Sequence, residues 1–433
     1  MTMQQIAPQP TIRAAENLGV KVRTNCRSCD SRTLIQVLDL GKVYVSNFVD
    51  STEAALYPRA PLELVLCPHC SLLQLSHTMP PEWLYRDYSN RSANDAGAPA
   101  ALAEIATKAS EFVGLSCGDA VLDIGCNDGT MLRSFSVPGI HRIGFEPAIN
   151  LNREASQGTD RIVPEFFTRG PVAGERFRIV TCVATMESLD DPNQLIADVA
   201  SVLTADGVWL IEMNYLPLLL ASNGFDAVRH EHLAYYSLTS LEPLLARHGL
   251  VVADAEINGS HGGSLRVYVV HEGFPARLAV RRDRVRSMRD REAAEALNLP
   301  PTYEKFGERI SIIGNRLNAW LRRERANNRI ICGHGGSASA NALLQVFGID
   351  HSLIDSMTEV NSELWGKYTV GTWIPIVPEA QARTQADDLL ILPWYLFREI
   401  RRREAGFVER GGKLITPLPQ PQVSDSQGTQ LIP

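Results

Sequence analysis

The run VLDIGCNDGTML at residues 121–132 decides the fold of the middle of the chain. An apolar, strand-like stretch ends at Ile124, and Gly125 and Gly129 follow it in a short loop before a helix that we expect to begin near Thr130. Glycines at such a turn let a ligand approach the backbone closely, and the start of the helix offers free N–H groups. The run therefore predicts a loop that binds a nucleotide-type cofactor.

A cofactor loop of this kind is usually followed by an acidic residue that binds the ribose, and the chain has one at a suitable position. Glu146 comes seventeen residues after Gly129 and closes the next strand-like run, IGFEP, so it could accept hydrogen bonds from both hydroxyls of a ribose. The spacing differs from the dinucleotide pattern G-x-G-x-x-G and suits the Asp-x-Gly-x-x-x-Gly loop of S-adenosylmethionine (SAM) enzymes. A plain tight turn is the alternative. The predicted cofactor-binding residues are Asp123, Gly125, Asn127, Gly129 and Glu146.

Strand-like and helix-like segments alternate on both sides of this loop. The runs AVLDIG, HRIGFE, FRIVTCV and GVWLIEM form one series, and RIICGHGG, HSLID, DDLLILP and GGKLITPLP form a second. This alternation is typical of an α/β protein with a parallel, doubly wound sheet. We therefore expect two α/β units.

Two Cys-x-x-Cys pairs, Cys26/Cys29 and Cys67/Cys70, precede the cofactor loop. Zinc prefers four thiolates in a tetrahedron, and the two-residue gap lets both sulfurs of a pair reach one ion. Four protein ligands leave no open position, so the predicted role of zinc is structural. Buried thiols or a disulfide pair are the alternatives, but the other four cysteines are scattered along the chain.

Composition excludes several classes of protein. The chain has 433 residues, 45% of them hydrophobic and 21% charged, which is enough for several domains. A net charge of −7 argues against a nucleic-acid surface, and no apolar run is long enough to cross a membrane. The first eighteen residues lack the pattern of a secretory signal. We expect a cytoplasmic protein, where paired cysteines bind metal more often than they form disulfides.

The predicted boundaries divide the chain into four segments. A zinc module covers residues 1–85 and a cofactor-binding domain covers 86–275. Residues 276–420 hold a connector, rich in Arg and Glu, and the second α/β unit. We expect the connector to be long solvated helices, with a partner-binding helix as the alternative. The tail, 421–433, is predicted to be disordered.

Several of these segments together resemble one family. The cysteine pairs, IGCNDGTML, FDAVRHEHLAYYS (225–237), HGGSLRVYV (261–269) and GGKLITPLP (411–419) are similar to those of sugar C-methyltransferases that act on nucleotide-linked 4-keto-deoxyhexoses. The resemblance covers nearly the whole chain. It implies a class I SAM-methyltransferase sheet between a zinc module and a second, Rossmann-like α/β domain, with the sugar bound between the last two.

The resemblance also implies a reaction. A proton leaves the ring carbon beside a ketone, and the resulting enolate takes the methyl group of SAM. His232 would be the base, and Glu231 would hold a substrate hydroxyl. In an extended chain these two side chains point to opposite sides, so both can touch the substrate only if the loop bends. A hydrogen-bonded loop cluster, or part of a metal site, is the alternative for this HEH run.

Four further residues are candidates for substrate binding. Tyr88 fits the family pattern, and His230 belongs to the HEH run. His261 opens a glycine turn that would let the backbone pass close to a substrate. Arg266 follows this turn and could hold either structure or a phosphate.

The chain departs from the family where the sugar should bind. Arg229 stands where Tyr is usual, and its charge could stabilise an enolate oxygen or bind an anionic group. The same charge would lower the pKa of a neighbouring histidine. These changes at the predicted sugar-binding site predict a different sugar or a changed chemistry. The other departures are Asn90 for Tyr, Ala184 for Asn, Ser188 for His and Ser339 for Lys.

A second reading comes from the other glycine run. Gly333, Gly335 and Ala338 fit G-x-G-x-x-A, and Asp355 comes twenty residues after Gly335. This pattern would suit an NAD(P)-dependent nucleotide-sugar oxidoreductase. A non-catalytic nucleotide-sugar binding protein is a third reading, given the altered positions. As partners we expect a nucleotide-linked sugar, no nucleic acid and no membrane, with a monomer favoured.

Overall fold

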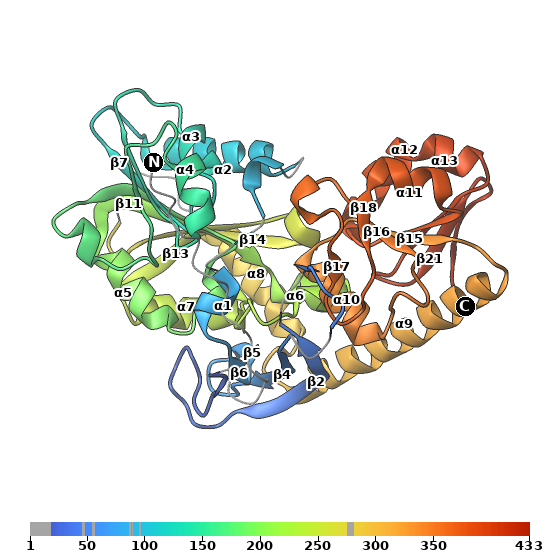
Figure 1. Ribbon diagram of the computed structural model, residues 1–433. Coiled ribbons are helices and arrows are strands. Elements are labelled where there is room, and N and C mark those ends of the chain that lie inside the picture. Colours follow the sequence, from blue (N-terminus) through green and yellow to red (C-terminus); the bar gives the residue numbers. More distant parts are fainter. Residues whose placement is uncertain are drawn as a thin grey trace.

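The structure of the protein is a computed structural model that describes residues 19–45, 48–53, 57–85, 88, 90–94, 97–274 and 281–433. The first eighteen residues, which lack a secretory pattern, lie outside this range. Figure 1 shows three parts: a small N-terminal module, a middle domain and a C-terminal domain. Among the described residues, every helix is too short or too polar to cross a bilayer.

The middle domain is a doubly wound sheet of seven strands in the order β13-β14-β11-β10-β7-β8-β9. All neighbours pair in parallel except β14, which is antiparallel to β11 and β13. The strands are β7 (Ala120–Ile124), β8 (His141–Phe145), β9 (Arg161–Val163), β10 (Phe177–Val183), β11 (Leu203–Asn214), β13 (Leu250–Asn258) and β14 (Ser264–His271). β7 and β10 are apolar and almost wholly buried, as expected for central strands with both faces covered. This order and direction are those of the predicted class I fold.

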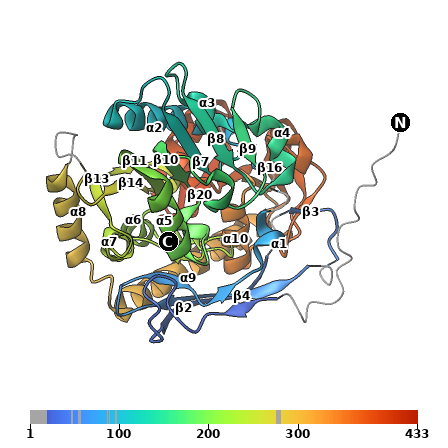
Figure 2. The same cartoon turned by 90° about the vertical axis from the view of Figure 1, so that its left-hand side faces the viewer.

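Helices cover both faces of this sheet (Figures 1 and 2). They are α2 (Ala98–Val113), α3 (Thr130–Ser134), α4 (Asn152–Ala155), α5 (Pro192–Val202), α6 (Leu216–Ala221) and α7 (Leu238–Ala246). α2 buries Leu102, Ile105 and Ala109 at helical spacing, and it ends where Gly114 takes a left-handed conformation with φ 64°.

The N-terminal module is built around a four-stranded sheet in the order β12-β5-β4-β2. Three of its strands are β2 (Ile35–Tyr44), β4 (Arg59–Leu66) and β5 (Leu73–Leu75). The fourth, β12 (Ala234–Tyr235), belongs to the middle part of the sequence and immediately follows the HEH run. Short pairs complete the module: β1 (Lys21–Val22) with β6 (His77–Thr78), and β3 (Phe48–Val49) with β17 (Tyr368–Thr369), followed by α1 (Pro81–Tyr85). The module is therefore joined by strand pairing to both larger domains.

The C-terminal domain has a second seven-stranded sheet, in the order β18-β16-β15-β19-β20-β21-β22. Its strands are β15 (Ile331–His334), β16 (Ser356–Glu359), β18 (Ile376–Pro378), β19 (Asp388–Ile391), β20 (Lys413–Thr416), β21 (Gln422–Asp425) and β22 (Gly428–Leu431). Its helices are α10 (Ala338–Phe347), α11 (Glu379–Gln385), α12 (Phe397–Arg403) and α13 (Ala405–Glu409). The first five strands are parallel, which gives the predicted Rossmann-like order.

The prediction of a disordered tail at 421–433 is wrong. β21 pairs with β20 and β22 extends the sheet, both antiparallel. Val423 and Ser424 are buried, and the Ile432 amide donates to the Pro421 carbonyl. Its polar, Pro-containing composition suggested disorder. Strands at the edge of a sheet need few apolar residues of their own, because the neighbouring strand pairs with their backbone.

The connector is also more than a solvated link. α8 (Arg282–Ala294) buries Val285 and Met288 in the core of the middle domain. Its Glu292 is 2% exposed and accepts hydrogen bonds from the Leu238 and Thr239 amides at the start of α7. α8 therefore belongs to the middle domain, because one carboxylate and two apolar side chains fasten an otherwise charged helix.

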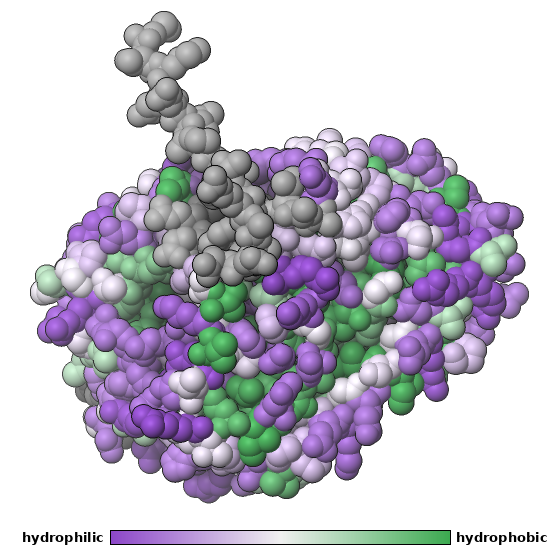
Figure 3. All heavy atoms as spheres, turned by 60° about the horizontal axis from the view of Figure 1, so that its bottom comes forward, coloured by the Kyte–Doolittle hydropathy of each residue, from purple (hydrophilic) through white to green (hydrophobic). Residues whose placement is uncertain are grey.

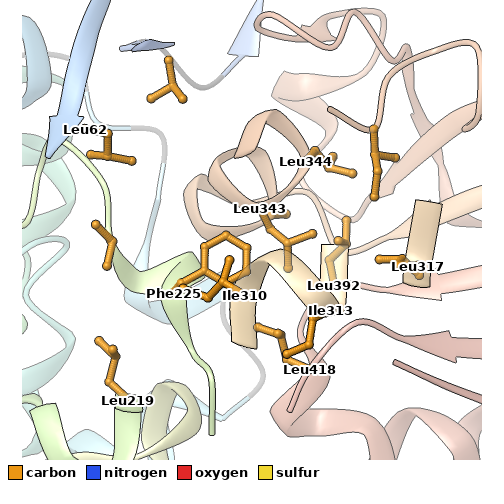
Figure 4. Close-up of a cluster of buried hydrophobic side chains, with 14 of the residues drawn as sticks. Leu62, Leu219, Phe225, Ile310, Ile313, Leu317, Leu343, Leu344, Leu392 and Leu418 are labelled. Carbon is orange, nitrogen blue, oxygen red and sulfur yellow. The ribbon is translucent and has the colours of Figure 1, made fainter. Parts of the chain in front are cut away.

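The second connector helix, α9 (Pro300–Ala326), contributes to a core shared by all three parts. Figure 4 shows Leu62 of the module and Phe225 of the middle domain with Ile310 of α9 and Leu343 of α10 in one apolar cluster. Figure 3 turns the face below this cluster forward, where apolar side chains reach the surface in patches among charged ones, as is usual for globular proteins. The shared core fixes the three parts against one another around the residues described next.

Candidate active site

The four predicted metal ligands come together. The sulfurs of Cys26, Cys29, Cys67 and Cys70 all lie within 4.8 Å of one another. The Sγ atoms of Cys26 and Cys70 are 3.5 Å apart, and those of Cys29 and Cys67 are 3.6 Å apart. Tetrahedral zinc with bonds of about 2.3 Å requires sulfur separations of about 3.8 Å. The donor set therefore fits zinc, and the metal is structural.

The two halves of the zinc site share one backbone shape. The Asp30 amide donates to the Cys26 carbonyl, and the Ser71 amide donates to the Cys67 carbonyl. Asp30 and Ser71 both have φ 61° and directly follow the second cysteine of their pair. The Gln74 side chain donates to Cys26 Sγ at 3.3 Å, and Gln74 pairs with Ala234 of β12. The metal site is thus linked through β5 to the strand that follows His232.

The cofactor loop has the predicted shape. Gly125, Asn127 and Gly129 all have positive φ, and α3 begins at Thr130. A Cβ atom on Gly125 would come within 2.5 Å of Thr185 Oγ1, and one on Gly129 would lie 2.8 Å from the Ala155 carbonyl oxygen. Only glycine fits at these two turns. The loop therefore forms a cradle at the carboxyl edge of β7, the edge where open α/β sheets bind ligands.

Glu146 directly follows β8 and points back to this loop. Its Oε2 accepts the Asn127 amide and its Oε1 accepts the Ala148 amide, both at 2.8 Å. Each carboxylate oxygen has a second lone pair for a ribose hydroxyl. Burial raises the pKa of Glu146, and the two amides oppose this. The arrangement fits the adenosine end of SAM.

We expected Asp123 to contact the cofactor, but its side chain lies beneath the loop. Its carboxylate is buried beneath the loop and accepts a hydrogen bond from Thr181 Oγ1 at 2.7 Å. Burial raises its pKa to about 7. Asp128, which the sequence analysis missed, shapes the loop instead: it accepts bonds from the Thr130 amide and from the Ala93 amide. An Asp side chain that accepts the amide two residues further on forms an Asx turn, and Asp in a glycine-rich loop is a signal for such a turn.

We expect Glu146→Gln to weaken SAM binding by about 10- to 100-fold, since a hydrogen bond to a charged group contributes about 1.5–3 kcal/mol. The amide keeps the size of the side chain but cannot accept two hydroxyls. Calorimetric titration with SAM measures the change, and Glu175→Gln is the matched control, because Glu175 pairs with Arg161 on the surface. Equal affinity in the wild type and Glu146→Gln would contradict the role.

The segment 225–237 bends at its centre. The His232 amide donates to the Arg229 carbonyl at 3.0 Å, so residues 229–232 form a turn. The bend brings the Arg229 guanidinium 2.8 Å from a carboxylate oxygen of Glu231 and 2.8 Å from His232 Nε2. It is the bent loop that a joint role of Glu231 and His232 requires. A third contact, Arg229 Nη1 to Ser339 Oγ at 2.8 Å, reaches α10 of the C-terminal domain.

Burial and Arg229 together keep His232 neutral. A guanidinium can only donate, so Nε2 of His232 accepts and the imidazole is neutral. Burial, and then the charge of Arg229, lower the pKa of His232 well below its ordinary value. Arg229 thus contacts both the predicted base and Ser339, so two of the departures from the family pattern meet beside His232.

The other candidates divide into two groups. Tyr88 lies within electrostatic range of Arg229, Glu231 and Glu146, and so stands between the turn and the cofactor loop. His261 is exposed, and its ring lies 6.5 Å from that of Tyr395 in the C-terminal domain. A positive charge on His261 would lower the pKa of His232. These two candidates lie around the turn.

The side chains of His230 and Arg266 have polar partners within the protein. His230 turns to the module, where its Nε2 is 3.2 Å from the Pro61 carbonyl oxygen. Arg266 is 2% exposed and pairs with Glu212 at 2.6 Å and Glu104 at 3.3 Å. Carbonyl and carboxylate groups of the protein already bind both side chains, and His230 also lines the small cavity beside Arg229 and Glu231. Their contact with the substrate stays a prediction.

Asp355, the acidic residue of the predicted dinucleotide pattern, does not lie beside the glycine loop. Asp355 precedes β16 and binds Arg325 at 2.6 Å and the Ile331 amide at 2.8 Å. Ile331 begins β15 and Arg325 lies in the last turn of α9 just before it, so Asp355 is at the amino ends of the strands, opposite to the loop at Gly335. Glu359, at the end of β16, is the acid on the loop side. Spacing alone placed the acid on the wrong end of the strand.

Comparison with known proteins agrees with this geometry. A zinc binding domain model matches residues 26–85, a methyltransferase domain model matches 94–255, and a C-methyltransferase C-terminal domain model matches 259–419. The C-methyltransferase NovU of Streptomyces niveus is 30% identical over 418 residues, covering 93% of this chain and 97% of NovU. The chain belongs to the C-methyltransferase family. It is a SAM-dependent C-methyltransferase with a zinc-binding N-terminal module.

Solved structures resemble the C-methyltransferase only over part of its length. A SAM-dependent methyltransferase from Clostridium acetobutylicum is 14% identical, with a TM-score of 0.33, over 41% of this chain and 93% of its own. Magnesium protoporphyrin IX methyltransferase from Synechocystis, with bound SAM, is 14% identical, with a TM-score of 0.32, over 42% and 85%. Both likenesses are too loose to bear on function.

Proposed function

We propose that this C-methyltransferase methylates a carbon next to the ketone of a nucleotide-linked keto-deoxysugar, in deoxysugar biosynthesis. The observation that carries the proposal is the turn at 229–232, where Arg229, Glu231 and His232 converge beside Ser339 of the C-terminal domain. Removing a proton beside a ketone needs a neutral base and a cation for the developing oxyanion, and the turn holds one of each.

The proposed steps follow from these contacts. SAM supplies an electrophilic methyl group when bound in the loop at 125–129. His232 Nε2 can accept the carbon proton only after Arg229 leaves it. A ketone oxygen placed near Arg229 would draw the guanidinium away, which frees the base and stabilises the enolate oxygen in one movement. Glu231 would then be free to accept a hydrogen bond from a substrate hydroxyl.

The position of the turn supports a substrate that spans two domains. Arg229, His230 and Glu231 line a small cavity of about 20 Å³, and its other walls come from α10 of the C-terminal domain and from Tyr44 of the module, so the turn lies where the three parts meet. A nucleotide-linked sugar is long enough to touch several such surfaces, whereas a small acceptor needs only the middle domain. The altered residues at this junction support a sugar different from the usual 4-ketohexose of the family.

Binding and turnover test this function. SAM or S-adenosylhomocysteine should bind with a 1:1 stoichiometry, NADH should not bind, and a nucleotide-linked keto-deoxysugar should gain one methyl group on carbon, read by mass spectrometry and NMR. NADH binding without SAM binding would favour the oxidoreductase. SAM binding with sugar binding, but no methyl transfer to any keto-sugar, would favour a non-catalytic binding protein.

A further inference from the structure

A buried carboxylic acid that the proposed steps do not use lies next to the turn. Glu187 belongs to a short 3₁₀ turn, Met186–Ser188, that follows β10. It is 3% exposed, and its Oε2 has no hydrogen-bond partner among the described residues. A buried acceptor without a donor costs about 1–3 kcal/mol, more if it is charged. Such a group therefore calls for an explanation.

Backbone contacts place Glu187 at the site. Its carbonyl accepts the Leu233 amide at 2.7 Å, directly after His232. The hydroxyl of Tyr85 interacts with Ser188 and donates to the Glu231 carbonyl at 2.8 Å, which connects the Glu187 loop to the same turn. The loop also stands at the carboxyl end of β10, beside β7 and its cofactor loop, on the ligand-binding edge of the sheet.

No cation of the site neutralises this carboxyl directly. Arg229 acts on it at a distance but directs its guanidinium to Glu231, His232 and Ser339. The other charged or titratable groups around it are Glu212 of β11, the Cys182 thiol of β10, and the hydroxyls of Tyr88, Tyr235 and Tyr236. Burial raises the pKa of Glu187 to about 7, opposed by hydrogen bonds from the backbone amides of Glu187 and Asn214 and by the charge of Arg229, while Oε2 is left without a donor among the described residues.

A segment near the turn and the cofactor loop is held to the middle domain by hydrogen bonds. Tyr88 and residues 90–94 attach to the middle domain through Asn150, Asn127 and Asp128, whose side chains accept from the Tyr88, Ser92 and Ala93 amides. Bonds of this kind exchange for water or for ligand more readily than an apolar core separates. A ligand in the cofactor loop and at the turn would lie against this segment.

We propose that Glu187 selects the substrate by accepting a hydrogen bond from a donor group, a hydroxyl or an amino group, on the sugar ring. The proposal rests on the proposed function and narrows its substrate class to keto-deoxysugars that carry such a donor near the reacting carbon. A site built around a buried acceptor discriminates strongly against a ligand without the donor, because the acceptor then remains unpaired. Glu187 would be a specificity residue, with His232 still the base.

The test uses the full-length zinc-loaded protein with S-adenosylhomocysteine bound. Three nucleotide-linked keto-deoxysugars that differ at one ring carbon, bearing a hydroxyl, an amino group or hydrogen, are titrated calorimetrically. We expect the wild type to bind one donor-bearing sugar at least tenfold more tightly than the deoxy sugar. Glu187→Leu should remove this preference while leaving the affinity for the deoxy sugar within threefold.

The isosteric variant identifies the donor. If the donor is a hydroxyl, Glu187→Gln should keep most of the preference, because the amide oxygen still accepts. If it is an ammonium group, Glu187→Gln should lose the preference, and wild-type binding should strengthen as the pH rises through about 7, where the carboxyl becomes charged. Glu111→Gln, an exposed position on α2, is the control. Thermal unfolding checks that every variant is folded.

The outcomes separate this proposal from the proposed function. Equal affinity of the wild type for all three sugars, or an equal loss for all three in Glu187→Leu, would overturn the role of Glu187 and leave the methylation of keto-sugars standing. Binding of SAM with no binding of any keto-sugar would overturn both.

Discussion

Replacing Cys67 with serine should reduce methyl transfer to background, although Cys67 is far from the chemistry. A serine hydroxyl does not replace a thiolate in a tetrahedral zinc site, and structural zinc contributes about 10–16 kcal/mol of apparent binding energy to isolated zinc fingers. Because the module is part of a larger core, we expect a smaller but still large loss of folding stability, of several kcal/mol. Zinc content, thermal unfolding and turnover measure the three consequences.

The loss of activity follows from the strand pairing. β5 carries Gln74, which contacts Cys26 Sγ and pairs with Ala234, and the Leu75 amide donates to the Leu233 carbonyl. Without the metal, β5 no longer holds the residues that directly follow His232. Cys117→Ser is the matched control, since Cys117 is exposed and outside the metal cluster. A zinc-free Cys67→Ser protein with normal turnover would refute this link.

Replacing His232 with asparagine should lower the turnover number by about 10²- to 10⁴-fold, the usual contribution of a general base. SAM affinity should not change, because the cofactor loop and Glu146 do not contact His232. His248→Asn is the control, since that imidazole pairs with Asn193 and does not line the cavity at the turn. We expect it to cost stability but less than tenfold in turnover. Comparable turnover losses in both variants, with both folded, would contradict the assignment of His232 as base.

The same base can be examined by pH. Burial and Arg229 lower the pKa of His232 well below 6.5, so its neutral form persists throughout the neutral range and the acid limb of its activity lies at low pH. Arg229→Met removes the second cause. The pKa of His232 then rises, and the acid limb should move to higher pH while the maximal rate falls. An unchanged acid limb in Arg229→Met would show that Arg229 does not act on the base.

Local patterns in the sequence predicted the parts of the protein correctly. The cysteine spacing predicted the clustered thiols, and the glycine spacing predicted the shape of the loop after β7, because each depends on a turn of a few residues whose backbone shape permits few amino acids. The role of Glu146 toward the cofactor stays a prediction. The alternation of strands and helices likewise predicted both α/β units. These features need no information about distant residues.

The errors concern residues whose role depends on distant neighbours. Arg266 was read as a possible phosphate ligand, but its partners on α2 and β11 are distant in the sequence. Glu292 looked like one of many charges on a solvated helix, and it caps α7 instead. Asp355 was placed by spacing, which does not tell which end of a short strand an acid will occupy. In each case, the partner that decides the role comes from another element.

The sequence by itself determined that this chain holds a zinc site, a SAM loop and a second α/β unit. Each of these features depends on the backbone shape and spacing of a few consecutive residues, which the sequence shows directly. Only the tertiary structure decided what Arg229 and Glu187 face. Arg229 meets His232 and Ser339 because a turn and a shared core bring three domains together, and Glu187 Oε2 has no partner among the described residues because the elements packed around it bring no donor to that oxygen. Charge pairing and burial depend on every neighbouring element at once, and no local pattern contains them.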